Sequence, residues 1–343
     1  MTDLPETMVA ALCDAPGQPL RLDRVPVPQP AAGEYLVMME SCGLCHSDLH
    51  VQQGEEPMPA EAFPLILGHE GVGRIVAGDG PLGVGTRVGL PWLYGACLDC
   101  DPCLRGRETY CPQQKARGLD AAGAFAEFAL LDTRFATRIP DEIDPVTAGP
   151  LLCAGLTSWS ALARCELRAG QRLLVVGAGG LGQYAIAIAR AQGLRVAVAE
   201  PDESRRAEAR ALGADLVVPP GAAQDIRDWG GADITLNFAP TLAVWDLIAE
   251  VANPISQIVA VALVHDPVPL SMMWLIDGGH RVMGSSVGTR ADLRQFLDFA
   301  RDHPLAVDHE VLPFERVTEG LDRLARGDVR GRIVLDFGKT ETG

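Results

Sequence analysis

Hydrophobic and polar positions follow different patterns in the two halves of the chain. Before about residue 150 the apolar runs are short, as in YLVMM, GRIVAG and AFAEFALL, and glycine and proline separate them. Short apolar runs bounded by turn residues are typical of β-strands. The first half is therefore predicted to be β-rich, with short strands and many loops.

The second half alternates between two kinds of segment. Apolar runs typical of strands, QRLLVVG (171–177) and LRVAVAE (194–200), are separated by a helical pattern that ends in glycine. A polar-faced helical pattern and two more apolar runs follow. Strands that alternate with helices predict βαβ units and a parallel sheet. A helix at 290–302 and a strand at 331–337 close the chain, and pairing of that strand with the first half would make the alternating segment an insertion.

Composition narrows the possible partners. The chain has 343 residues, enough for two domains, and 48% of them are hydrophobic, which argues against disorder. A net charge of −16 repels phosphate backbones and anionic lipid, so we expect no nucleic acid and no membrane as partner. The apolar run 173–189 contains four glycines and is too short to span a bilayer. The first residues do not predict a secretory signal, so we expect a cytoplasmic protein. In the reducing cytoplasm, clustered cysteines are more often metal ligands than disulfides.

The segment CLDCDPCLRGRETYC carries a strong metal-site signal. Its four cysteines have the spacing C-x2-C-x2-C-x7-C and could enclose one tetrahedral Zn²⁺. Such a closed site leaves no coordination position open and would serve to hold a loop. An iron–sulfur cluster and a pair of disulfides are the alternatives. The four residues are Cys97, Cys100, Cys103 and Cys111.

The loop GAGGLG has the spacing of a dinucleotide-binding turn. Gly177, Gly179 and Gly182 follow a predicted strand, precede a predicted helix and belong to a unit of about thirty residues that ends at Glu200. Glycines there allow the backbone to approach a pyrophosphate, and Glu200 can accept hydrogen bonds from the ribose hydroxyls, which favours NAD over NADP. Arg205, like its neighbour in sequence, would favour NADP, although an exposed helix face explains both arginines more simply.

Taken together, the motifs resemble those of the zinc-dependent medium-chain alcohol dehydrogenases over nearly the whole chain. GLCHSDLH, LGHEGVG, the four-cysteine lobe, LLCAGLT, GAGGLG and VGTRADL follow one another in the order of that family. The resemblance implies an α/β protein with a GroES-like β-rich catalytic domain and a Rossmann doubly wound parallel sheet. We expect the catalytic domain at 1–152 and 286–343, with the zinc lobe at about 92–113, and the NAD-binding domain at 153–285.

The resemblance also implies a catalytic zinc, and hence two Zn²⁺ per chain. Cys45, His69 and Cys153 match its three protein ligands and leave a fourth position open for water or substrate. Glu70 matches a carboxylate that approaches the metal during ligand exchange, and Asp48 matches the group that orients His69. Alone, a single His or Cys in these short motifs has an ordinary structural interpretation. The other three cysteines, at positions 13, 42 and 165, are expected not to bind metal.

Further matches concern the proton and the cofactor. Ser47 and His50 match a proton relay that runs through the nicotinamide ribose hydroxyl, although a helix cap and an exposed polar residue are the ordinary alternatives. The residues expected to contact the cofactor, by resemblance or by the glycine motif, are His46, Thr157, Gly177, Gly179, Gly180, Leu181, Gly182, Glu200, Arg205 and Arg332.

These matches predict an NAD-dependent alcohol dehydrogenase that interconverts an alcohol with an aldehyde or ketone. Glu56 stands where relatives that act on ethanol carry a bulky aromatic residue, which favours larger alcohols. Trp92 is expected to line the pocket, and Met272 and Met273 to reach a subunit interface or the pocket mouth. A homotetramer is expected by resemblance. The alternatives are an NADP-dependent aldehyde or ketone reductase of the same fold and a non-catalytic relative.

Overall fold

The computed structural model describes residues 4–56 and 58–338, and they divide into two compact units. The first comprises Met1–Cys153, Thr289–Asp302 and Asp308–Gly343, and the second Ala154–Gly288 and His303–Val307. In this division the chain returns to the first unit at Thr289, and the five residues His303–Val307 group with the second unit.

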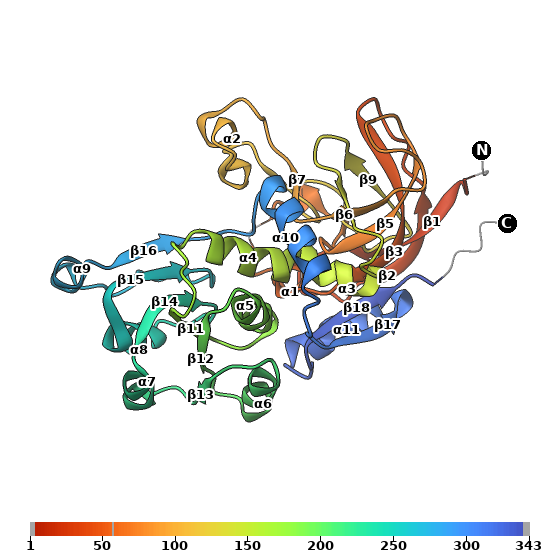
Figure 1. The fold of residues 1–343 in the computed structure, drawn as a ribbon. Helices are drawn as coiled ribbons and strands as arrows, with labels where there is room; N and C mark the ends of the chain where they lie inside the picture. Colours follow the sequence, from red (N-terminus) through yellow and green to blue (C-terminus); the bar gives the residue numbers. More distant parts are fainter. Residues whose placement is uncertain (1–3, 57, 339–343) are drawn as a thin grey trace. The chain divides into compact units, whose positions relative to one another are not determined.

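The first unit is built around a seven-stranded sheet (Figure 1). Its central strand β3 pairs antiparallel with β5, with β9 and with the closing strand β18, which confirms that the second half is an insertion. The strands of this sheet are β10 (Thr137–Arg138), β6 (Arg87–Leu90), β5 (Gly71–Ala77), β3 (Glu34–Gly43), β18 (Arg332–Asp336), β17 (His309–Pro313) and β9 (Phe128–Asp132).

Two smaller sheets and five short helices complete this unit. One sheet is β2 (Arg21–Pro26), β1 (Thr7–Cys13) and β4 (Leu65–Ile66), and the other is β7 (Leu93–Gly95) with β8 (Lys115–Ala116). The prediction of a β-rich first half is therefore confirmed. The helices are α1 (His46–Gln53), α2 (Asp101–Leu104), α3 (Pro145–Pro150), α10 (Arg290–Asp302) and α11 (Val317–Ala325).

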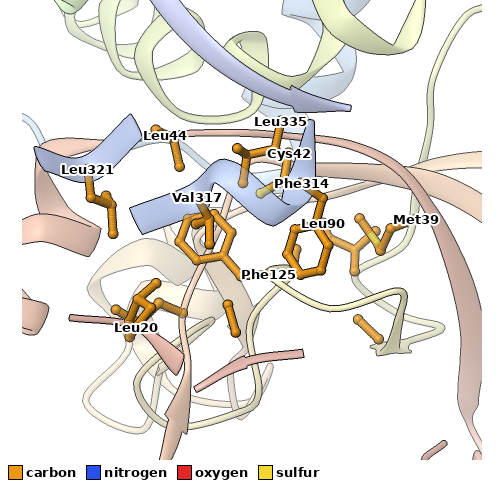
Figure 2. Close-up of a cluster of buried hydrophobic side chains, with 14 of the residues drawn as sticks. Leu20, Met39, Cys42, Leu44, Leu90, Phe125, Phe314, Val317, Leu321 and Leu335 are labelled. Atoms are coloured by element: carbon orange, nitrogen blue, oxygen red, sulfur yellow. The ribbon is translucent and has the colours of Figure 1, made fainter. Parts of the chain in front are cut away.

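The core of the first unit lies between the large sheet and α11. Figure 2 shows Leu44, the residue after β3, and Leu335 of β18 beside Val317 and Leu321 of α11. Cys42 belongs to this core, with a fully buried sulfur. Because core and sheet combine both ends of the chain, they hold β3, and the loop after it, in a defined position.

The second unit is the predicted parallel sheet with helices on both faces (Figure 1). The strand order is β13 (Leu216–Val218), β12 (Arg195–Ala199), β11 (Arg172–Val176), β14 (Ala232–Asn237), β15 (Ala252–Ala260), β16 (Arg281–Gly284). The order reverses at β11, the strand that leads into the glycine loop, and such switch points are where open α/β sheets bind ligands. The helices are α4 (Leu156–Ala163), α5 (Gly180–Ala191), α6 (Glu203–Ala211), α7 (Ala223–Trp229), α8 (Val244–Val251) and α9 (Met272–Gly278).

A continuous helical run, Pro145–Ala163, is apolar and long enough to cross a membrane by length and composition. Of its most apolar window, 78% is buried inside the protein, as in the core helix of a globular domain. Pro150 lies inside this run and has no N–H to donate to the preceding turn. The next five residues, Leu151–Gly155, form a wider π-helical turn, a feature that often marks functional sites.

Candidate active site and metal centres

Four buried residues of the first unit bring their ligand atoms within 4.8 Å of one another. Cys45 is the N-cap of α1, directly after β3, and His69 and Glu70 come directly before β5. Cys153 lies in the π-helical turn. The four residues expected around a catalytic zinc are therefore neighbours in space, although they come from three distant segments of the chain.

The carboxylate of Asp48 organises two of these ligands. One oxygen accepts hydrogen bonds from Gly68 N at 3.0 Å and from His69 Nδ1 at 2.9 Å. The other accepts from Cys45 N at 3.2 Å, which closes a capping box at the start of α1. Because Nδ1 donates to a carboxylate, Nε2 is the imidazole nitrogen left for a metal.

Two polar atoms in the cluster are buried and lack a hydrogen-bonding partner within residues 4–56 and 58–338. They are Nε2 of His69 and Oε2 of Glu70. An unsatisfied buried polar group lowers the free energy of unfolding by about 1–3 kcal/mol, and a bound ligand would remove this cost. Gly43 makes room for Glu70, because a Cβ there would lie 1.9 Å from Oε2.

The sulfur geometry also fits a metal ion. The Sγ atoms of Cys45 and Cys153 are 3.9 Å apart. Two sulfurs at tetrahedral positions, each about 2.3 Å from zinc, would lie about 3.8 Å apart. A disulfide needs a separation of about 2.05 Å. The donor set of two thiols, one imidazole and one carboxylate therefore suits zinc.

The electrostatics of the cluster favour the thiolate form of one of its two cysteines. A hydrogen bond from the Cys153 thiol lowers the pKa of Cys45 well below its ordinary value, against the effect of burial. The same bond, together with burial, raises the pKa of Cys153. Burial opposes the charged imidazole of His69, but Asp48 and Cys45 outweigh it and raise its pKa. A metal ion binding here would displace the protons on Cys153 and His69.

Arg332 lies beside this cluster. It is buried, pairs with Glu70 through Nη2 and donates from the same nitrogen to Leu44 O at 2.8 Å. Burial raises the pKa of Glu70 to about 7, with Arg332 opposing the rise. The sequence motifs suggested a pyrophosphate contact for Arg332 and did not reveal the Glu70 partner, which is 262 residues away in the chain.

The four-cysteine lobe forms the second cluster. Its four sulfurs lie within 4.8 Å of one another, and all nine cysteines of the chain are free of disulfides. Neighbouring sulfurs are 3.4–3.9 Å apart, as in Cys97 to Cys111 at 3.4 Å and Cys97 to Cys103 at 3.9 Å. This spacing is too long for disulfides, and it suits a single tetrahedral ion better than a multi-iron cluster.

Ser47 and His50 lie on α1 next to the first cluster. Ser47 Oγ is 3.8 Å from Cys45 Sγ. The alternative of Ser47 as a helix cap is wrong, because Cys45 occupies the N-cap and Asp48 completes the capping box. The ring of His50 is 6.2 Å from that of His46 and contacts Glu55, a residue that the motifs did not single out. Trp92 meets His69 edge-on, with ring centres 5.0 Å apart.

The glycine loop is built by three different requirements in the second unit. Gly177 has φ of +89°, which favours glycine. A Cβ on Gly182 would lie 2.0 Å from Gly177 O, so this glycine allows α5 to pack against the loop. A Cβ on Gly179 would meet nothing within 4 Å, which leaves open space at the N-terminus of α5, where a phosphate would be stabilised. Gly180 and Leu181 begin that helix.

Glu200 directly follows β12 and lies at the same loop. Its carboxylate is buried and accepts hydrogen bonds from Ala178 N at 2.7 Å and from Asp202 N at 3.0 Å. Arg205 follows on α6 with a half-buried side chain, and Thr157 is buried on α4. The glycine loop and a buried carboxylate at the end of the next strand are therefore together, the arrangement that dinucleotide-binding sites use.

Comparison with known proteins agrees with this geometry. The domain described as "Alcohol dehydrogenase GroES-like domain" matches residues 31–141, and "Zinc-binding dehydrogenase" matches residues 180–302. An alcohol dehydrogenase of Geobacillus stearothermophilus is 37% identical over 336 residues, which cover 96% of this chain and 99% of that protein. The chain belongs to the zinc-type medium-chain alcohol dehydrogenase family.

Solved structures of the family share the whole fold. A cinnamyl alcohol dehydrogenase from Sorghum bicolor has a TM-score of 0.86 and 29% identity, covering 98% of both chains. Acetophenone reductase from Geotrichum candidum, in complex with NAD, has a TM-score of 0.84 and 26% identity, covering 97% of this chain and 98% of that one. The protein is thus an alcohol dehydrogenase with a GroES-like domain and a Rossmann-type domain.

Proposed function

We propose that this alcohol dehydrogenase uses zinc and NAD to interconvert an alcohol larger than ethanol with its aldehyde or ketone. The observation that carries the proposal is the buried cluster of Cys45, His69 and Cys153, with a ligand nitrogen that has no partner in the described part of the chain. Zinc held there would supply a Lewis acid that makes the alcohol hydroxyl easier to deprotonate. NAD would supply the hydride acceptor.

The protein's own residues have distinct tasks in this proposal. Asp48 fixes the imidazole of His69 so that Nε2 faces the metal. Ser47, beside the sulfur of Cys45, receives the substrate proton, and His50 passes it to water. The Glu70–Arg332 pair keeps a carboxylate next to the metal site without an unpaired buried charge. The four-cysteine lobe would hold a second, structural zinc.

The preference for NAD is supported by Glu200. Two charges about 4 Å apart interact by roughly 4 kcal/mol at an effective dielectric near 20, so a 2′-phosphate beside this carboxylate would be disfavoured. The NADP-dependent reductase is the second candidate. The Arg205 guanidinium makes no hydrogen bond among residues 4–56 and 58–338, so it could pair with a 2′-phosphate. The proposed cofactor contacts also include His46, exposed at the start of α1.

A homotetramer in the cytoplasm completes the proposal. Self-association is supported by a set of exposed apolar side chains on the second unit, around α9 and the edge of its sheet. Met272 is 70% exposed and Ile276 is 65% exposed, and both lie on α9 beside the exposed Met273, so they form a group of exposed apolar side chains. Light scattering on the purified protein measures the subunit number directly.

The decisive experiment is a panel of primary and secondary alcohols and their aldehydes, each assayed with NAD and with NADP. We expect higher kcat/KM with NAD and with substrates larger than ethanol. Cys45→Ser should abolish turnover and retain the fold, as seen by circular dichroism. Equal or higher efficiency with NADP would reject the role of Glu200, and full activity of Cys45→Ser would reject the metal site.

A further inference from the structure

Helix α1 ends in a turn that folds the chain back over its last residues. Gly54 has φ of +79°, and its N–H donates to Val51 O at 3.1 Å. The N–H of Glu55 donates to His50 O at 2.9 Å. These two hydrogen bonds define a Schellman motif, in which the residue after the glycine is brought against a residue of the last helical turn.

This turn normally joins two apolar side chains, but here it joins a carboxylate and an imidazole. Oε2 of Glu55 contacts Nδ1 of His50. An ionised carboxylate has no hydrogen to donate, so Nδ1 must carry the proton of this bond. A neutral His50 then has a bare Nε2, and this nitrogen has no hydrogen-bonding partner among the residues that the structure describes.

We propose that Glu55 is a positioning residue that holds His50 in the tautomer able to accept a proton at Nε2. The inference rests on the proposed function, in which His50 takes the substrate proton from Ser47 through the cofactor ribose. A base must present an unprotonated nitrogen toward the proton it removes, so the tautomer matters as much as the location of the ring.

The His50–Glu55 pair is exposed, so its fixed side-chain geometry requires a structural cause. The His50 side chain is 35% exposed and that of Glu55 is 57% exposed, and most such pairs contribute little because holding two long side chains costs entropy. Here the backbone is already fixed by the two turn hydrogen bonds. Gly54 is also confined, since a Cβ on it would lie 2.7 Å from Pro16. The turn therefore supplies the geometry, and the side chains lose less freedom.

The test measures the tautomer and the catalysis separately. Nitrogen-15 NMR of the imidazole distinguishes Nδ1–H from Nε2–H, and His50→Gln identifies the signal. In the wild type we expect neutral His50 as the Nδ1–H tautomer, and in Glu55→Gln a mixture of both. The matched control is Glu61→Gln, which removes the same charge from an exposed residue of the neighbouring η1 turn (Ala60–Ala62) and should change nothing.

With NAD and zinc present, Glu55→Gln should lower kcat for alcohol oxidation about three- to tenfold and leave the KM for alcohol unchanged, with partial rescue by imidazole buffer. Glu55→Asp should retain more activity than Glu55→Gln. In the His50→Gln background, Glu55→Gln should have no further effect, because the two residues act as one unit. These results would support the proposal.

An unchanged tautomer in Glu55→Gln would overturn the positioning role, whatever the activity. Full activity of His50→Gln would overturn the relay itself, and with it the role of Glu55. The first result concerns only Glu55 and the second the proposed function, so the two failures are distinguishable.

Discussion

At the scale of single residues, the glycine loop shows that members of one motif have different physical roles. We expect Gly182→Ala to lower the free energy of unfolding by more than about 2 kcal/mol, because its Cβ would overlap the carbonyl of Gly177. Gly179→Ala should change stability by less than about 0.5 kcal/mol, because its Cβ meets open space. The same Cβ would project into the space where we propose that the cofactor pyrophosphate binds, so it should weaken cofactor binding. Denaturant unfolding and fluorescence titration with NADH measure the two effects, and equal stability losses would contradict this assignment.

The proton path is also decided at individual residues. Ser47→Ala should nearly abolish alcohol oxidation, because Ser47 is the hydroxyl next to the Cys45 sulfur. His50→Gln should lower the rate less, at most roughly 10²–10⁴-fold, with partial rescue by buffer bases. Steady-state rates across pH, with zinc content and NADH binding as controls, test both variants. Near-normal rates for Ser47→Ala with metal and cofactor bound would reject the relay.

At the scale of elements, the four-cysteine lobe is fastened to α10 by one side chain. Oε1 of Glu108, between the third and fourth cysteines, accepts hydrogen bonds from Arg290 N at 3.1 Å and from Arg290 Nε at 2.9 Å. Arg290 also donates to Arg134 O at 2.8 Å, and its guanidinium lies over the ring of Phe135. A short lobe helix of four residues gains little stability by itself, so this attachment and the metal must supply it.

We therefore expect Glu108→Gln to destabilise the protein by about 1–3 kcal/mol. Burial opposes ionisation, but the hydrogen bonds from Arg290 prevail and lower the pKa of Glu108. A carboxyl with a lowered pKa in the folded state adds stability above its unfolded pKa of about 4.3, and that stability is lost as pH falls through the folded value. The difference between wild type and Glu108→Gln, measured by urea unfolding, should shrink as pH is lowered below about 4. A difference independent of pH would contradict this account.

At the scale of the whole molecule, two metal sites with different tasks are expected. Elemental analysis should find two zinc ions per chain, and one in each of Cys45→Ser and Cys100→Ser. The first variant should lose activity and retain its melting temperature within a few degrees. The second should melt earlier, because metal binding supplies the folding free energy of the lobe. One metal or none in fully active protein would contradict the assignment.

Features that lie within short segments of the chain could be predicted from the amino-acid sequence. The strand, glycine loop and helix around residues 171–193 follow from local periodicity and from the steric needs of glycine, and the structure has them as β11 and α5. The four-cysteine cluster could also be predicted from local sequence, because all its sulfurs come from fifteen consecutive residues. Even the Glu55 contact has a local signal, a glycine at the end of α1 followed directly by a carboxylate.

Contacts between side chains that are distant in the sequence could not be predicted from local patterns. The cluster depends on pairs such as Cys45 with Cys153, 108 residues apart, and Glu70 with Arg332, 262 residues apart. The pairing of β18 with β3 and the shared core bring these segments together, and neither follows from the spacing of residues along the chain. Local propensity acts over a few residues, whereas such contacts form because burial of apolar surface in one common core outweighs the entropy of closing long loops.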